Sequence, residues 1–178
     1  MKKLIVTLII LTLLGGGYYY FNNVNVQGET TQSSEHTNQQ LKPEHIYTPE
    51  ELLVEVNAER AKVGVAPLQL DERLNQSAQK KADDMRIHNY YEHISPIDGK
   101  HGYSYINEYM GGVCQYSSEN LNKSLITDDP VPTSSNGWMS SQAHRDAILD
   151  PKYDYIGFGS SRAKDITQLY VAHFCDLP

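Results

Sequence analysis

The chain has 178 residues, of which 39% are hydrophobic and 21% are charged, a composition typical of a globular protein with about one domain. Twenty-two acidic residues against 15 lysines and arginines give a formal net charge of −7. With that charge no basic surface attracts a phosphate backbone, which argues against nucleic acid as a partner.

An apolar stretch at the N-terminus predicts export. Lys2 and Lys3 precede residues 4–21, which are apolar apart from two threonines and a run of three glycines. A positive start followed by an apolar run is typical of a secretory signal. The run is also long enough to cross a hydrocarbon core of about 30 Å, with tyrosines where an interfacial belt would lie. Residues 1–21 are therefore expected to be a signal peptide or an uncleaved signal anchor in contact with the membrane. The absence of a small-residue cleavage motif favours the anchor.

Residues 22–46 are rich in Asn, Gln, Thr, Ser and Glu and contain few apolar residues. Such a segment cannot bury enough surface to offset the entropy lost on ordering, so we expect a flexible polar stalk. The folded domain is expected over residues 47–178, outside the cytoplasmic membrane. The protein is thus predicted to be secreted, or to be held at the extracellular face by its N-terminal segment.

Two helices are expected at the start of this domain. Thr48 is followed by a proline and, three residues after the cap, by a glutamate, a pattern that begins a helix. Gly64 is the natural stop of this helix. Asp71 is the next N-cap, and the apolar residues after it recur every three or four positions. This spacing predicts a second amphipathic helix that ends around residue 88 or 89.

Shorter elements are expected in the rest of the domain. In chain order they are a helix over 103–110 stopped by two glycines, a segment over 116–123 of ambiguous type, a helix over 133–140 that carries Trp138, a helix over 143–149, and strands over 155–159 and 168–174. Helices thus come first and strands come last. That order predicts an α+β fold in which helices pack on an antiparallel sheet.

Only two cysteines occur, Cys114 and Cys175, and both follow the export signal. In an oxidising compartment a disulfide between them is expected, and it would tie the final strand to the middle of the domain. The alternative is a pair of buried free thiols.

Three residues stand out as candidates for chemistry. His93 lies just before a Ser-Pro turn, Glu119 follows a pair of serines, and His144 opens a short helix. Two imidazoles and a carboxylate can hold a divalent metal with open positions, or can act as an acid and base set. Their spacing of about 25 residues does not distinguish these roles from a structural one, in which each histidine caps a turn.

Several short motifs occur in the order seen in the CAP superfamily, which groups cysteine-rich secretory proteins, antigen 5 and pathogenesis-related 1 proteins. They are Asn-Ala-Glu-Arg at 57–60, Ala-Asp-Asp-Met at 82–85, His-Ile-Ser-Pro-Ile-Asp-Gly at 93–99, Glu-Asn-Leu at 119–121, the Gly-Trp and Ala-His-Arg segments within 137–145, and Ile-Gly-Phe-Gly at 156–159. Over residues 48–174 the chain resembles this superfamily, and its bacterial SCP-like extracellular branch is the nearest likeness.

The resemblance implies an α-β-α sandwich, an antiparallel sheet flanked by helices, with a large cleft that receives two histidines and one or two acidic side chains. His93, Glu119 and His144 match the motif positions of the cleft. Ser141 stands where eukaryotic relatives carry a second acidic residue, so the site has three members here instead of four. Some members bind zinc or another divalent ion at this cleft and others do not, so no cofactor is assigned with certainty.

Three functions follow from these observations. The first is an extracellular binding module for a lipid, glycan or peptide, with or without a divalent metal such as zinc held by His93, His144 and Glu119. The second is a metal-dependent hydrolase, a peptidase or esterase, in which the same three residues are catalytic. The third is a purely structural polar cluster. The sequence favours a binding module over an enzyme.

Overall fold

The computed structural model describes residues 45–125, 132–133, 137–164 and 166–178, so the expected signal segment and all but the end of the expected stalk lie outside the described residues. In chain order the elements are α1 (Pro49–Lys62), β1 (Gln69–Leu70), α2 (Glu72–His88), α3 (Gly102–Met110), β2 (Ser117–Leu125), the 3-10 helix η2 (Trp138–Ser140), α4 (Gln142–Leu149), β3 (Tyr155–Arg162) and β4 (Thr167–Cys175). The mixture of helices and strands confirms the α+β class.

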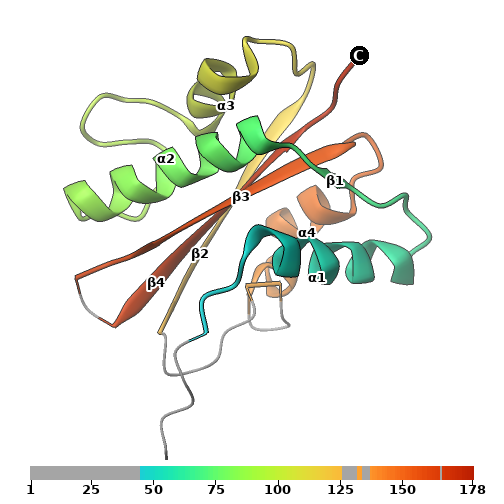
Figure 1. Ribbon diagram of the computed structural model, residues 1–178, viewed down its shortest axis with the longest axis horizontal. Helices are drawn as coiled ribbons and strands as arrows, with labels where there is room; N and C mark the ends of the chain where they lie inside the picture. The colour runs from blue at the N-terminus through green and yellow to red at the C-terminus, as the bar shows by residue number, and fades with distance from the viewer. Residues whose placement is uncertain (1–44, 126–131, 134–136, 165) are drawn as a thin grey trace, which may run out of the picture. The chain divides into compact units, whose positions relative to one another are not determined.

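The strands form one sheet in the order β1-β3-β4-β2, so β4 is a central strand and β2 lies at an edge (Figure 1). β4 runs antiparallel to both of its neighbours. Every residue of β4 is buried because helices cover both faces of the sheet. The pairing of β4 confirms the expected antiparallel sheet, to which the two-residue β1 adds a short parallel pairing with β3.

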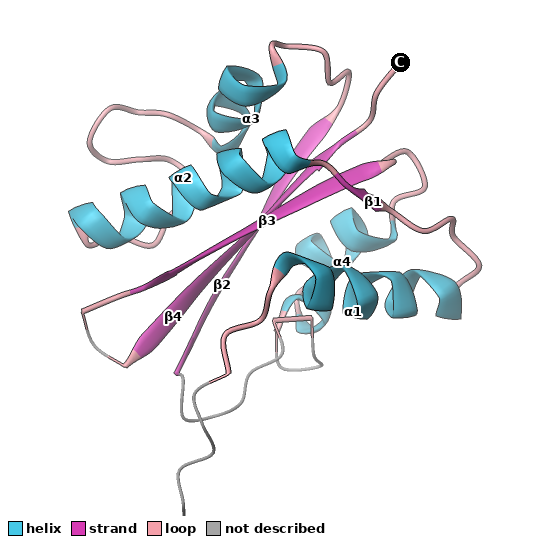
Figure 2. Ribbon diagram, in the orientation of Figure 1, coloured by secondary structure: helices cyan, strands magenta, loops and turns pink. Residues whose placement is uncertain are grey.

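Helices cover the sheet from both sides and confirm the α-β-α sandwich (Figure 2). On one face, α2 and α3 pack through two clusters of buried side chains, one around Ala82 and Val171 and the other around Leu74 and Ile106. On the other face, α1, η2 and α4 share a cluster centred on Trp138, which is fully buried and stacks on Phe158 at 6.2 Å between ring centroids. The α2 face carries the candidate site described below.

Two glycines let α2 lie directly on β3. A Cβ atom at Gly157 would stand 2.2 Å from backbone atoms of α2, and one at Gly159 would meet the next turn of the helix at the same distance. Beyond the short β1, two α2 side chains form hydrogen bonds with the free edge of β3. Asn75 accepts from the Phe158 amide, and Gln79 both accepts from the amide and donates to the carbonyl oxygen of Ser160. This contact fixes α2 relative to the sheet and covers an edge that would otherwise be open.

The predicted helix signals are confirmed at the first three helices. Thr48 and Glu51 form a reciprocal capping box at the start of α1, and the Asp71 carboxylate caps α2. Asn89 in a left-handed conformation ends α2, and Gly111 with a φ of 67° ends α3. These ends form where local side chains satisfy the free backbone groups of a helix, which is why they can be read from the sequence.

Two expected elements differ from the structure. The ambiguous segment is the nine-residue strand β2, which lies in the chain between α3 and α4, so the order of helices first and strands last does not hold. The helix expected over 133–140 is limited in the described residues to η2, a 3-10 turn of three residues. Ser and Asn make up five of the nine residues of β2, and its pairing with β4 along its whole length overrides this weak strand propensity.

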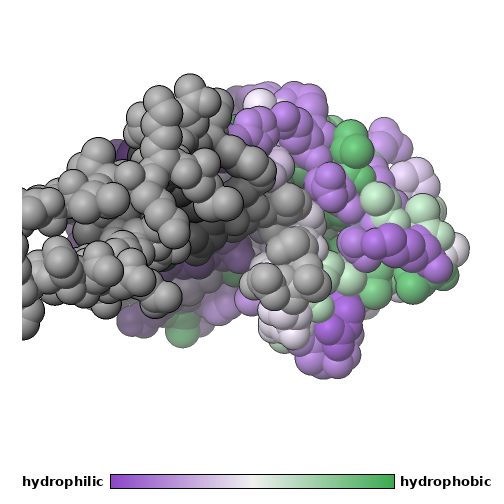
Figure 3. All heavy atoms as spheres, turned by 90° about the horizontal axis from the view of Figure 1, so that it is seen from below, coloured by the Kyte–Doolittle hydropathy of each residue, from purple (hydrophilic) through white to green (hydrophobic). Residues whose placement is uncertain are grey.

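Part of one face of the described residues is visible in Figure 3. The coloured part of that face is mainly hydrophilic, with smaller groups of hydrophobic residues between the hydrophilic ones. Within the described part of the chain, no helix combines the length and the apolar character needed to cross a membrane.

The expected disulfide is confirmed. Cys114 and Cys175 are bonded, 61 residues apart in sequence. The bond joins the segment before β2 to the end of β4. It therefore cross-links the sheet at the end where Ser117 and Cys175 are the first paired residues of β2 and β4.

Removing this disulfide is expected to lower the free energy of unfolding by about 4 kcal/mol, because a cross-link across this many residues restricts the unfolded chain. The measurement is urea denaturation of the oxidised protein and of the Cys114→Ala/Cys175→Ala variant. The wild-type protein with its disulfide reduced is the control and should match the variant. A loss below about 1 kcal/mol would contradict the prediction.

Candidate functional site

Glu119 is the centre of the candidate site. Its side chain is only 5% exposed, yet both carboxylate oxygens are bonded to histidines. His93 Nδ1 lies 2.8 Å from Oε1, and His173 Nε2 lies 2.9 Å from Oε2. The His93 side chain is 55% exposed whereas that of His173 is fully buried. The site is therefore a buried carboxylate that is hydrogen-bonded to His173 on its buried side and to His93 on its solvent side.

Strand register places two of these groups opposite each other. Glu119 of β2 and His173 of β4 are direct cross-strand partners, so their side chains project from the same face of the sheet, toward α2. Gly157 is the partner of His173 on its other side. The absence of a side chain there leaves room for α2 to approach, and α2 brings Ser77 within reach of the imidazole.

Gly102, the first residue of α3, packs directly on the carboxylate. A Cβ atom at this position would lie 2.7 Å from Glu119 Cδ and 2.9 Å from Oε1. Only glycine fits at that distance unless Glu119 moves. The start of α3 therefore forms a wall of the site and helps to fix the side-chain conformation of Glu119.

Two opposing effects act on the pKa of Glu119. Burial alone would raise it, but hydrogen bonds from His173 and His93, with the positive charge of Lys81, outweigh burial and lower the pKa to about 2. Glu119 is therefore a stable anion at neutral pH. It acts as an acceptor with both oxygens already engaged.

The hydrogen-bond chain continues inward from Glu119 to α2. Ser77 Oγ lies 2.6 Å from His173 Nδ1 and also 3.1 Å from the carbonyl oxygen of Leu74. An ionised carboxylate can only accept hydrogen bonds. His173 Nε2 therefore carries a hydrogen and donates a hydrogen bond to Glu119. Ser77 either donates to the neutral imidazole or accepts from the charged one while donating to Leu74. In both states the bond to Glu119 is kept.

Lys81 supports the segment that carries His93. Its side chain is completely buried, and its ammonium group donates to the carbonyl oxygens of Glu92 at 2.8 Å and His93 at 3.2 Å. The ammonium group also lies over the rings of Tyr90 and Tyr105, at 4.9 and 5.4 Å from their centroids. A buried cation thus fixes the backbone at His93 and adds positive charge near Glu119.

His144 approaches from the other side of the edge strand. Its ring centroid is 6.4 Å from that of His93, and its carbonyl oxygen accepts from Asn120, the neighbour of Glu119. Burial, and then the charge of His93, lowers the pKa of His144, which favours a neutral imidazole. Because β2 is an edge strand, groups from both sides of the sheet can meet around it.

The three predicted residues are therefore brought together, with Glu119 bonded to His93 and His93 facing His144. Ser141 lies at the junction of η2 and α4, where its amide bonds to Trp138 and its carbonyl oxygen accepts from Arg145. None of its described contacts is with the other three. Its role in the cleft stays a prediction.

Sequence reasoning did not find His173, Ser77 and Lys81. His173 stands in an otherwise apolar strand segment, and a histidine in a buried strand needs a polar partner. A histidine in such a strand therefore indicates a polar partner, but the identity of the partner depends on the pairing of β2 with β4. Ser77 and Lys81 are spaced one helical turn apart on the buried side of α2, where only a polar site explains them.

The geometry does not provide the three-ligand metal site that the sequence leaves open. Among the described residues no group of three or more His, Cys, Asp or Glu side chains has an arrangement that could hold a metal ion. Both Glu119 oxygens accept from histidines, so a metal ion would share the carboxylate with these two donors. Metal binding by this trio stays a prediction.

Comparisons with known proteins identify the family and the fold. The family model "CAP: Cysteine-rich secretory protein family" matches residues 53–174. The Bacillus subtilis protein YkwD is 34% identical over 157 residues, which cover 83% of this chain and 56% of YkwD, so the chain spans little more than half of that relative.

Two solved structures share the fold. An outer surface protein of Borrelia burgdorferi has a TM-score of 0.63 at 20% identity, and the likeness covers 72% of this chain and 92% of that one. An extracellular protein of Bacillus anthracis that contains an SCP domain has a TM-score of 0.59 at 21% identity, and the likeness covers 72% of this chain and 40% of that one.

His173→Leu is expected to lower the free energy of unfolding by about 3–5 kcal/mol, because it leaves one oxygen of a buried carboxylate without a donor. His173→Gln keeps an amide donor near that oxygen and should lose less than half as much. Urea denaturation at pH 7 compares the two, with the exposed His45→Leu as control. Equal losses in both His173 variants would show that the bond to Glu119 does not matter.

Stability is also expected to fall in acid because of Glu119. Its folded pKa of about 2 lies below the ordinary value of 4.5, so its contribution is complete above pH 4.5 and is lost as the pH falls toward 2. The loss over this window should be about 3 kcal/mol. His144, whose pKa is also lowered, adds a loss that begins near pH 6.5.

The Glu119 contribution is isolated by comparing the wild type with Glu119→Gln at each pH from about 7 to about 2. The stability difference between the two proteins should shrink only below pH 4.5, the ordinary pKa of the carboxyl group. A difference that stays constant through the whole acid range would show that Glu119 is not held as an anion by its surroundings.

Proposed function

The chain belongs to the CAP family of cysteine-rich secretory proteins, and we propose that it is an extracellular module that binds a peptide over His93 and Glu119. The observation that carries the proposal is the half-exposed imidazole of His93, anchored through Nδ1 on a buried anion. With Nδ1 engaged, Nε2 is left as the group that can meet a ligand. An oriented imidazole costs less entropy on binding than a freely rotating one.

Apolar side chains are exposed close to this polar centre in the chain. Three of them lie on the segment that carries His93 and at the start of α3, namely Ile94, Ile97 and Tyr103. A peptide offers both backbone hydrogen-bonding groups and separate apolar side chains, which suits such a surface. A lipid chain would need a continuous apolar channel, and a glycan would need more polar groups than this rim provides.

The state of Glu119 favours binding over hydrolysis. A general base works best when its pKa lies near the working pH, and the Glu119 pKa of about 2 makes it a weak base at neutral pH. Its two oxygens already accept from histidines and its side chain is only 5% exposed, which restricts the approach of an attacking water. The same features support a role in holding His93 in place.

The extracellular location rests on three kinds of support. The N-terminal run of residues 4–21 is typical of an export signal, the disulfide between Cys114 and Cys175 suits an oxidising compartment, and relatives with this fold are named as outer surface or extracellular proteins. We propose that residues 1–21 direct export or anchor the chain, that residues 22–46 form a stalk, and that the domain acts outside the membrane.

The test is retention of ligands by the immobilised chain from three pools: a mixed-sequence peptide library, phosphatidylglycerol vesicles and soluble cell-wall glycan fragments. Peptides should be retained at about ten times background or more by the wild type. His93→Ala should reduce retention to background because it removes the exposed group, and Glu119→Gln should weaken it about tenfold because His93 loses its anchor.

His45→Ala is the matched control, since His45 is an exposed histidine that pairs with Glu51 at the start of α1. This variant should retain peptides as the wild type does. Retention of only the vesicles or the glycans would contradict the peptide assignment. Cleavage of the retained peptides that requires Glu119 would instead favour the hydrolase.

A further inference from the structure

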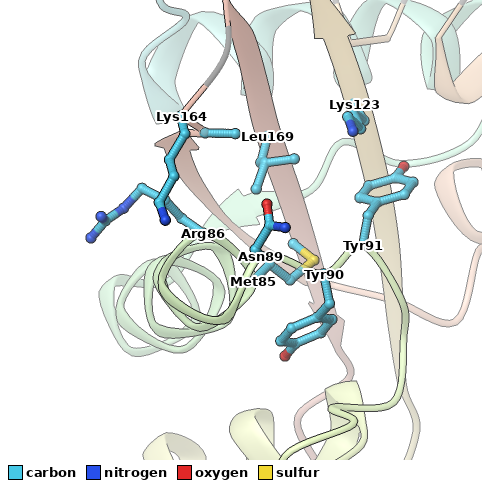
Figure 4. Close-up of a pocket in the computed structure, with 9 residues that line it drawn as sticks. Met85, Arg86, Asn89, Tyr90, Tyr91, Lys123, Lys164 and Leu169 are labelled. Carbon is cyan, nitrogen blue, oxygen red and sulfur yellow. The ribbon is translucent and has the colours of Figure 1, made fainter.

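A hollow lies on the α2 face of the sheet, at the end where α2 terminates (Figure 4). Its volume is about 300 Å³, at the lower end of the range for ligand pockets. Its walls come from the last turn of α2 and the segment after it, from β2, from β4 and from the turn between β3 and β4. The lining residues are Met85, Arg86, Asn89, Tyr90, Tyr91, Lys123, Ala163, Lys164 and Leu169.

The charged residues in the described part of this lining are all cationic. Arg86 comes from α2, Lys123 from β2 and Lys164 from the turn, and no Asp or Glu is among the described residues that line the hollow. The three therefore gather at one place from distant parts of a chain whose formal net charge is −7. Since like charges repel, such a cluster in an acidic protein calls for a negative partner.

The three cations differ in how far they are already engaged. Arg86 donates from Nε to Ser161 Oγ at 2.8 Å and lies 3.5 Å from Asp83, contacts that hold its guanidinium group in one orientation. Neither lysine forms an ion pair with an acidic side chain of the described residues. Figure 4 shows the Arg86 guanidinium directed away from the hollow, so the two lysines are the cations that can turn toward a ligand.

The remaining lining supplies apolar and aromatic surface. Met85 and Leu169 are buried side chains of the α2 and β4 layers, and they lie between the cationic residues in Figure 4. Partial burial raises the pKa of Tyr90 and of Tyr91 to about 12, with help from Asp84 and Glu119 respectively, so both rings stay neutral. A ligand here meets positive charge at the rim and apolar atoms below it.

We propose that this hollow binds a small organic anion, a phosphate or carboxylate attached to a compact aromatic or apolar body. The anionic group contacts Lys123 and Lys164, and the body packs on the rings of Tyr90 and Tyr91, above the buried side chains of Met85 and Leu169. Charge-assisted bonds to a phosphate or carboxylate are stronger than neutral ones, which supplies the affinity that a shallow hollow lacks. The proposal does not depend on peptide binding at His93.

The experiment is a titration of the full chain followed by NMR of the backbone amides, with phenyl phosphate and benzoate as probes. Inorganic phosphate tests the charge alone, and phenyltrimethylammonium tests the ring with the opposite charge. We expect saturable shifts at Met85 and Leu169 with at least one of the two aromatic anions. Inorganic phosphate should bind at least tenfold more weakly, and the cation should give no saturable shift at these residues.

Lys123→Gln/Lys164→Gln should raise the dissociation constant of the better aromatic anion at least tenfold. Lys80→Gln is the matched control, because Lys80 is an exposed lysine of α2 outside the lining, and it should leave the constant within twofold of the wild type. Raising the salt concentration should weaken binding in the wild type more than in the double variant.

Equal affinity in the Lys123→Gln/Lys164→Gln and Lys80→Gln variants would overturn the proposal, as would the absence of saturable shifts with both anions. His93→Ala should bind the better anion as the wild type does. If His93→Ala abolished anion binding, the anion would belong to the His93 site and the separate hollow would be refuted. Loss of peptide retention in that variant with anion binding intact separates the two proposals.

Discussion

A carboxylate buried in a protein must be given donors for its oxygens, and this requirement at Glu119 organises the candidate site. An ion taken out of water loses several kcal/mol of solvation free energy, and only close, well-aligned hydrogen-bond or ion-pair partners compensate for this loss. Here the partners are His173 from the central strand and His93 from the loop after α2. The site therefore exists only when β2, β4 and that loop are all in place.

The packing around Glu119 explains features that look unrelated in the sequence. Gly157 allows α2 to contact β3, and this contact brings Ser77 to His173. Gly102 allows α3 to start against the carboxylate itself. Close backbone approach at both glycines is thus part of the same arrangement, since a side chain at either one would push a helix away from the sheet.

Local signals and short motifs could be predicted from the sequence, whereas long-range pairing could not. The caps at Thr48 and Asp71 and the stop at Gly111 are local chemistry, and the sequence predicts them correctly. It does not predict the strand β2, because the polar residues of that segment become a strand only through pairing with β4. His173 escapes prediction for the same reason, since its partner lies 54 residues away and is set by strand register.

The two lysine environments on the α2 face show how one surface can hold two different kinds of site. Lys81 is fully buried, and its charge is met by carbonyl oxygens, two aromatic rings and the nearby Glu119, so it has nothing to offer a ligand and serves to hold the His93 segment. Lys123 and Lys164 are exposed beside an apolar floor and face a space large enough for a small molecule. A cationic side chain has a structural role when the protein itself supplies the groups that balance its charge. It can bind a ligand when its charge is balanced only by solvent. By this criterion the His93 region is a prearranged hydrogen-bonding centre, and the neighbouring hollow is the place on this face where an external anion would gain most.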